Sequence, residues 1–224
     1  MALTQEQVVR RAVELMAEAG LEALTLRRLA TDLGVSAPTL YWHVRNKRQL
    51  LDLMAEALVS RAGRSPSPAP GQPWWEWLAE RARGQWRALT SHRDAALVVA
   101  GNRPTEATLP EIEEVVANLV TVGFPPAEAL RAILSIGNYV IGCAVERQAE
   151  AARDPDPERD ARLLELARDL PNLRAAMAGL EPPGPAAGDA GFEHGLALLI
   201  GGLRARHARL LEPAGVAGGP HEAG

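Results

Sequence analysis

A short stretch near the N-terminus gathers side chains of the kinds that bind nucleic acid. Within about two helical turns the chain places Thr39, Tyr41, Trp42 and His43. Between positions 27 and 48 it also carries one acid, Asp32, and five bases: Arg27, Arg28, Arg45, Lys47 and Arg48. Such groups stack on sugars, donate hydrogen bonds to phosphates and touch thymine methyl groups. The stretch therefore predicts a DNA-reading surface.

A structural role for the same residues is the alternative. Leu40 and Val44 would then be core residues, and Tyr41 and Trp42 would fill a gap between helices. The basic residues would form a solvated face. Two large aromatic rings and an imidazole on so short a helix cannot all point inward. Because capping signals, a turn, aromatic residues and charge coincide here, the DNA-reading interpretation is favoured.

Two short helices joined by a tight turn are expected to hold these residues. The first begins after Thr25 as N-cap and ends at Gly34. Its expected buried residues are Leu26, Leu29, Ala30 and Leu33. The second begins after Ser36, has Pro38 in its first turn and runs from Thr39 to about His43. This is the layout of a helix-turn-helix whose second helix enters the major groove.

Longer helices are predicted on both sides of this unit. A capping box at residues 4–7 precedes an apolar stripe that ends at Gly20, and Asn46 with Gln49 opens another helix. The proline-rich residues 63–73 predict a linker. Beyond it, helical spacing predicts helices at about 74–90, 94–100, 110–122, 126–152, 159–170 and 189–211.

The predicted organisation is an all-α protein with two domains. Its apolar residues, 47% of the chain, fall at helical spacing, and only 4% of the chain is aromatic. The expected boundaries are a helix-turn-helix domain at 1–62, a linker at 63–73, a larger helical ligand-binding and dimerisation domain at 74–211, and a disordered tail at 212–224.

Charge and cysteine usage narrow the functional classes. The net charge of −4 argues against a protein that coats nucleic acid, but residues 1–64 hold nine bases and seven acids, so positive charge is concentrated there. A single cysteine, Cys143, excludes an internal disulfide and cannot form a zinc site with five scattered histidines. The N-terminus lacks the apolar segment of a signal peptide. We expect a cytoplasmic protein.

Neither catalysis nor a membrane role is indicated. Cys143 lies in an apolar helix, no supported Asp/His pair is present, and no glycine-rich phosphate loop follows a strand. The helices at 126–152 and 189–211 are apolar on nearly all sides, but polar residues interrupt both. One subunit is too small to bury both helices completely. We therefore predict a homodimer, no enzyme activity, no cofactor and no membrane partner.

The same residues resemble a known family. Thr25-Leu-Arg-Arg-Leu-Ala and Gly34-Val-Ser-Ala-Pro-Thr-Leu-Tyr-Trp-His-Val-Arg-Asn-Lys-Arg resemble the DNA-binding domain of the TetR family of transcriptional regulators. Further along, Ser91-His-Arg-Asp, Arg103-Pro-Thr-Glu, Gly123-Phe124 and Gly142-Cys143 resemble the ligand domain of its tetracycline repressor type, in matching order and spacing. The likeness covers nearly the whole chain, least clearly at 153–188.

The resemblance implies roles for the DNA-binding residues. Arg27 would read a guanine, and Pro38 and Tyr41 would make apolar contacts to bases. Phosphates would be held by Thr39, Trp42, His43 and Lys47. Two positions depart from the tetracycline repressor type: Leu26 replaces a threonine that contacts phosphate, and Ala37 replaces a glutamine that reads adenine. The operator should therefore differ.

The resemblance also implies a ligand pocket. Its residues would be Arg81, Gln85, Trp86, Val99, Asn102, Arg103, Pro104, Val115, Leu130 and Ile133, with Trp77 as a further wall. For each tryptophan, core packing is the alternative. Tetracycline repressors hold their drug as a magnesium chelate, and the matching positions here are Gly63, Arg81 and Val99. Since none of these can coordinate magnesium, we expect no metal. The effector would be apolar or amphipathic, and Arg81 or Arg103 offers a partner for an anionic group.

These observations predict a sequence-specific repressor that a small-molecule effector releases from a palindromic operator. The alternative is a ligand-independent or activating regulator on the same fold, because a sequence does not state the sign of regulation. The sequence names neither the effector nor the target genes.

Overall fold

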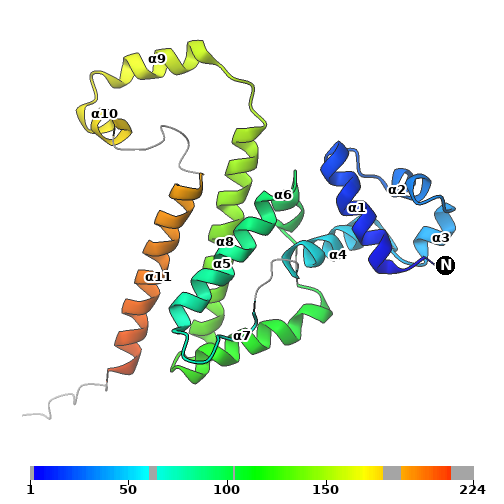
Figure 1. The fold of residues 1–224 in the computed structure, drawn as a ribbon, viewed down its shortest axis with the longest axis horizontal. Helices are drawn as coiled ribbons and strands as arrows, with labels where there is room; N and C mark the ends of the chain where they lie inside the picture. Colours follow the sequence, from blue (N-terminus) through cyan, green and yellow to red (C-terminus); the bar gives the residue numbers. More distant parts are fainter. Residues whose placement is uncertain (1–2, 61–64, 103, 179–187, 213–224) are drawn as a thin grey trace, which may run out of the picture.

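The chain folds entirely into helices and loops in the part that the structure describes. The computed structural model describes residues 3–60, 65–102, 104–178 and 188–212 (Figure 1). Its elements are α1 (Gln5–Ala19), α2 (Leu26–Asp32), α3 (Ala37–Tyr41), α4 (Lys47–Ser60), α5 (Trp74–Thr90), α6 (Ala95–Val99), a 3₁₀ turn η1 (Glu106–Thr108), α7 (Leu109–Thr121), α8 (Pro126–Ala151), α9 (Pro157–Ala167), α10 (Pro171–Ala178) and α11 (Asp189–Leu211). The predicted all-α fold class is confirmed.

Local capping determines where the N-terminal helices begin. Thr4 and Gln7 form the expected capping box of α1, and the side chains of Thr25 and Ser36 accept hydrogen bonds from the first turns of α2 and α3. A small core joins α1 to α4, made by Met16, Leu29, Leu40, Val44 and Leu50. Of the leucines and alanine expected to be buried on α2, Leu29 and Ala30 are buried, and Leu26 and Leu33 are half-buried against the same core, because so short a helix buries only one face.

The larger domain is built around α5 and α8, with α11 packed against both (Figure 1). The Trp86 and Phe192 rings stack with centroids 4.4 Å apart, and the Tyr139 hydroxyl donates to the Phe192 carbonyl at 2.8 Å. Burial raises the pKa of Tyr139 to about 12, which keeps this donor protonated. A Cβ at Gly195 would collide with the Tyr139 ring. Glycine therefore permits the close approach of α8 and α11.

Ion pairs fasten α11 to its neighbours. Arg83 forms a two-pronged pair with Glu193, with both nitrogen to oxygen distances at 2.8 Å. The Asp189 carboxylate accepts hydrogen bonds from the Trp86 indole and from Arg147. The hydrogen bond from Arg83 holds the pKa of Glu193 below its usual range. The hydrogen bonds from Trp86 and then from Arg147 do the same for the pKa of Asp189.

Hydrogen bonds made by Leu21, Arg48 and Glu56 link the N-terminal domain to the larger one. Asp94 precedes α6 in a left-handed conformation (φ 60°), and its carboxylate accepts the Leu21 N–H at 2.8 Å. The Arg48 guanidinium, in the first turn of α4, donates to the Gly101 carbonyl at 3.1 Å. The N-terminal domain is therefore in direct contact, through Arg48 on α4, with the loop that follows α6.

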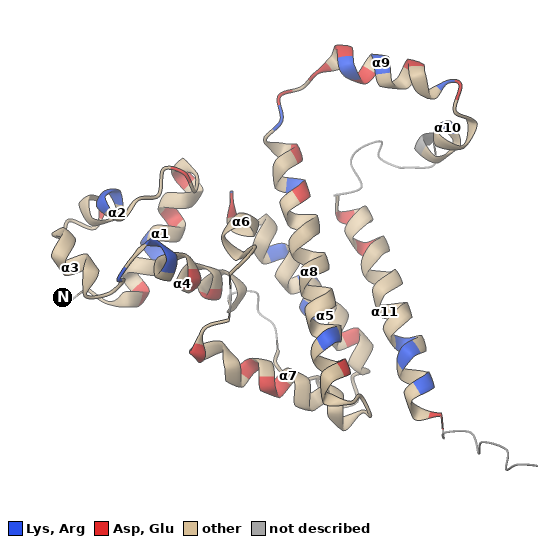
Figure 2. Cartoon of the chain, turned by 180° about the vertical axis from the view of Figure 1, so that it is seen from behind, with Lys and Arg blue, Asp and Glu red and all other residues tan. Residues whose placement is uncertain are grey.

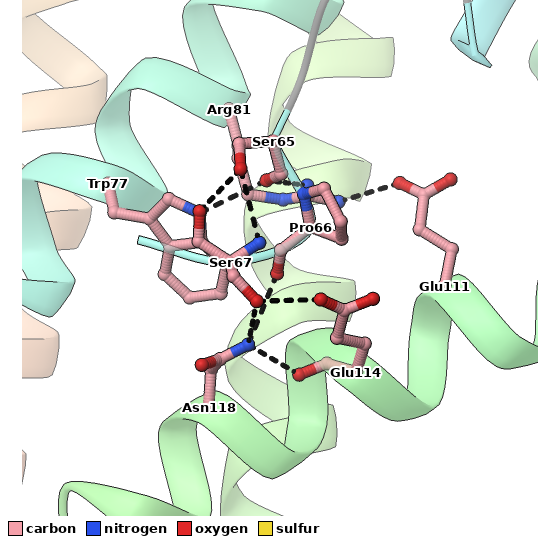
Figure 3. Close-up of polar contacts among 8 residues, drawn as sticks. All are labelled: Ser65, Pro66, Ser67, Trp77, Arg81, Glu111, Glu114 and Asn118. Carbon is pink, nitrogen blue, oxygen red and sulfur yellow. Dashed lines mark hydrogen bonds and ion pairs between the residues drawn. The ribbon is translucent and has the colours of Figure 1, made fainter. Parts of the chain in front are cut away.

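Residues 65–73, within the predicted linker, pack against the larger domain (Figure 3). The Ser65 carbonyl accepts hydrogen bonds from the Trp77 indole and the Arg81 guanidinium on α5. The Ser67 hydroxyl is bonded to Glu114 and Asn118 on α7. The segment thus bridges α5 and α7 instead of acting as a free spacer. Residues 61–64 lie outside the described residues.

The region after α8 differs most from expectation. The predicted helix at 159–170 begins at Pro157 and ends at Ala167, and α10 was not predicted. In Figure 1 the two short helices lie beyond the ends of α8 and α11. The leucines of these helices and of the turn between them are exposed: Leu163, Leu164, Leu166, Leu170 and Leu173. Of the predicted disordered tail, residues 213–224 lie outside the described residues.

An outward face of α8 and α11 is apolar and uncovered. Leu134 on α8 and Leu198 on α11 are exposed, and a Cβ added at Gly201 or Gly202 would meet no atom within 4 Å.

Among the described residues α8 alone is long and apolar enough to cross a membrane. It packs against α5, α6, α7 and α11.

Candidate DNA-reading surface and ligand cavity

The aromatic residues of α3 project into solvent. Trp42 is 88% exposed and Tyr41 is 52% exposed, whereas Leu40 and Val44 are buried beneath them. The alternative in which both aromatic rings fill a gap in the core is therefore wrong. Exposed apolar rings on a monomer are candidates for contact with a partner.

Of the remaining residues in and next to α3, some are exposed and others form hydrogen bonds that hold the ends of the helix. Ala37 and Pro38 are exposed in the first turn. The half-buried Thr39 has its hydroxyl 2.8 Å from the Ser36 hydroxyl, so it shares in the helix cap. The His43 carbonyl accepts the Gln5 side-chain amide at 2.9 Å, which fixes the end of α3 against α1. These contacts fix both ends of the helix while its outer face stays exposed.

Exposed basic residues lie on the two helices that flank α3 in the chain. Arg27 and Arg28 are exposed on α2, and Lys47 is exposed at the start of α4. Figure 2 shows the basic residues of α2 at one end of the molecule and acidic residues along α7. Arg48 was expected to join the basic surface, but its guanidinium faces Gly101 and the Asp52 carboxylate, 3.3 Å away.

A cavity of about 240 Å³ lies where α4, α5, α7, α8 and the loop after α6 meet. Six residues expected in a ligand pocket line it: Arg81, Val99, Asn102, Pro104, Val115 and Ile133. Sequence reasoning missed the contribution of α4, which supplies Asp52, Ala55, Glu56 and Val59. Their spacing of three and four residues places them on one helix face and was the available signal.

Other residues expected in the pocket lie elsewhere. Trp86 lies on the α11 side of α5, where its indole donates to Asp189 at 3.0 Å. Leu130 is exposed on α8, and Gln85 is half-buried outside the cavity lining. Trp77 points its indole nitrogen at the Ser65 carbonyl. Arg103 falls outside the described residues.

Arg81 is already engaged by protein groups. Its guanidinium donates to the Ser65 carbonyl and pairs with Glu111 at 3.0 Å (Figure 3). Only 11% of this side chain is exposed. An anionic effector at Arg81 would lie next to the Glu111 carboxylate, which already pairs with this guanidinium, so the expectation that Arg81 receives an anion finds no support in this geometry.

Comparison with known proteins identifies the chain. Residues 8–54 match the family described as bacterial regulatory proteins, tetR family, and residues 67–207 match the tetracyclin repressor-like C-terminal domain. The chain belongs to the TetR family. The TetR-family resemblance expected from the helix-turn-helix motif is confirmed.

Several relatives extend this result over most of the chain. Tetracycline repressor protein class C of Escherichia coli is 39% identical over 202 residues, which are 90% of each chain. A TetR variant from Acinetobacter baumannii AYE in complex with minocycline has a TM-score of 0.72 at 34% identity, covering 92% of this chain and 98% of that chain. TetR(class A) in complex with 5a,6-anhydrotetracycline and magnesium has a TM-score of 0.67 at 31% identity, covering 91% and 99%.

Membership in the TetR family determines the general activity. The protein is a ligand-responsive DNA-binding repressor and not an enzyme, as the absence of a catalytic motif in the sequence indicated. Such an activity requires one surface that binds DNA and one site that binds a small molecule.

Proposed function

We propose that this TetR-family protein binds a palindromic operator as a homodimer and releases it when a small molecule enters the cavity beneath α4. The observation that carries the proposal is the position of α4. Lys47, exposed at its first position, follows α3 closely in the chain, while Asp52 and Glu56 further along line the cavity. One rigid element therefore touches both sites.

A short chain of polar contacts supports coupling through α4. Asp52 lines the cavity and faces Arg48, and Arg48 donates to the Gly101 carbonyl in the loop that also supplies Asn102 and Pro104 to the cavity. A molecule that shifts this loop or Asp52 changes the position of α4. The spacing of the two reading helices in a dimer would change with it, and operator affinity would fall.

The uncovered apolar face of α8 and α11 supports the dimer. Leu134, Leu198 and the open glycines 201 and 202 present an apolar surface that a second copy would bury. A twofold pair of reading helices about one DNA turn apart matches a palindromic site. As an operator-binding protein, it acts in the cytoplasm, where the DNA is.

Two variants separate base reading from phosphate anchoring. Arg27→Ala is expected to weaken specific operator binding by about 1–3 kcal/mol and to relax the preference at one base pair, because a guanine contact is lost. Lys47→Ala is expected to weaken binding to all sequences alike and to reduce the salt dependence. Selection of bound DNA from a random pool, with affinities measured at several salt concentrations, checks both.

Arg159→Ala is the matched control, since Arg159 is an exposed arginine on α9, far along the chain from the reading helices. It should leave affinity, base preference and salt slope unchanged. A changed base preference in Lys47→Ala would contradict the division of roles. If the selected DNA sites lacked twofold symmetry, they would contradict the proposal that a homodimer binds a palindromic operator.

A further inference from the structure

The cavity is apolar overall but holds several carboxyl groups. Asp52 and Glu56 lie one turn apart on the same face of α4, and Glu111 lies on α7 across the cavity. Among the described lining residues Arg81 is the only cation. Three carboxylates against one guanidinium leave the described lining with an excess of negative charge.

The three carboxylates differ in their partners. Glu111 is paired with Arg81, and Asp52 faces Arg48 at 3.3 Å. Glu56 accepts a hydrogen bond from the Thr105 hydroxyl at 2.6 Å, and no cation of the described residues lies within ion-pair distance of it. Glu56 is thus a half-buried carboxylate on the cavity wall with a neutral partner only.

Such a carboxylate favours a cationic ligand. A charge partly removed from water interacts strongly with an opposite charge brought next to it, and an anion at the same place would be repelled. The surrounding Ala55, Val59, Val115 and Ile133 side chains offer apolar contact to the rest of such a molecule. Charge and surface together specify an amphiphile.

We infer that the effector is a cationic amphiphile, a compact apolar body with a protonated amine or similar organic cation that pairs with Glu56. This inference rests on the proposed function of the cavity as the effector site. It keeps the amphipathic effector expected from the sequence and replaces the anionic group, for which Arg81 or Arg103 was the expected partner, by a cation. Thr105 holds the carboxylate in place, so a ligand bound there contacts both α4 and the segment after α6.

A set of three probes of similar shape tests the charge preference. The compounds are 4-phenylbutylamine, 4-phenylbutanol and 4-phenylbutanoate, and their binding to the full-length protein is measured by calorimetry at pH 7 without operator. The amine should bind more tightly than the alcohol, and the alcohol more tightly than the carboxylate. Glu56→Gln keeps the acceptor for Thr105 but removes the charge. It should reduce amine affinity by about tenfold, the loss expected for a charged hydrogen bond, and leave alcohol affinity unchanged.

Two further variants complete the design. Glu113→Gln, an exposed position on α7 outside the cavity lining, should leave all three affinities unchanged. Arg103→Ala should not weaken amine binding. The inference is overturned if the carboxylate binds best, if Arg103→Ala and not Glu56→Gln removes binding, or if none of the probes binds.

Operator release is measured separately, by adding the amine to the protein–operator complex. Amine binding that depends on Glu56 without any operator release would leave the ligand class standing and contradict the proposed role of the cavity. Operator release by an anionic or neutral compound, with no release by the amine, would leave the repressor function standing. It would contradict the inferred class of ligand. The two failures are therefore distinguishable.

Discussion

Replacing Leu198 by glutamate is expected to convert the protein into a monomer and to reduce operator affinity by about 100-fold or more. Leu198 is 66% exposed on the outward face of α11, so the change should leave the subunit fold intact. In a dimer the two charges would be buried at the same interface without partners. Each reading domain would then bind its half-site alone, without the gain from linking two binding events.

Sedimentation velocity at micromolar concentration and operator titration measure the two effects. Leu109→Glu is the matched control, because Leu109 is also an exposed leucine (56%) at the start of α7, away from the proposed interface. It should remain dimeric and retain operator affinity. A dimeric Leu198→Glu protein with full operator affinity would show that α11 does not form the interface.

Magnesium-tetracycline is expected to be a poor effector of this protein. The drug concentration that releases half of the operator should be at least about 100-fold higher than for the class A repressor assayed alongside. TetR(class A) has been solved with an anhydrotetracycline and magnesium. Here Val99 on the cavity wall offers no metal ligand, and Arg81 is a cation paired with Glu111. Magnesium requires oxygen or imidazole ligands and is repelled by a nearby guanidinium.

Release of labelled operator DNA during titration with drug and magnesium measures this expectation. The described residues contain no group of three or more His, Cys, Asp or Glu side chains placed to hold a metal ion. Operator release at nanomolar drug would overturn the prediction. Release by a phenylalkylamine in the presence of EDTA would agree with a metal-free effector site.

Local signals predicted most of the fold, because they act within a few residues. The caps at Thr25 and Ser36 and the turn at Gly34 define α2 and α3 without reference to the rest of the chain. The helix α10 was missed, although Pro171 at its first position is a local start signal. The exposed positions of Tyr41 and Trp42 followed from the length of α3 alone.

The ligand cavity was harder to predict because it depends on helix faces and on tertiary contacts. Trp86 is five residues after Arg81, which rotates it by about 140° around α5 and places it toward α11. The helical period of 3.6 residues could have shown that Trp86 and Arg81 lie on different sides of α5. Nothing local indicates that the Ser65 carbonyl, from a segment read as a linker, would bind Arg81. The same holds for Arg48, whose turn toward Gly101 depends on how the two domains pack.

The exposure of Trp42 gives the protein a spectroscopic reporter of its own. Trp74, Trp77 and Trp86 are buried and Trp75 is half-buried against Arg204, so the longest-wavelength indole emission should come from Trp42. Acrylamide should quench this component first in the free protein, and Trp42→Phe should remove it. When the operator covers α3, the quencher should lose access to the ring. Occupancy of the DNA site can then be followed in unlabelled protein, separately from events in the cavity.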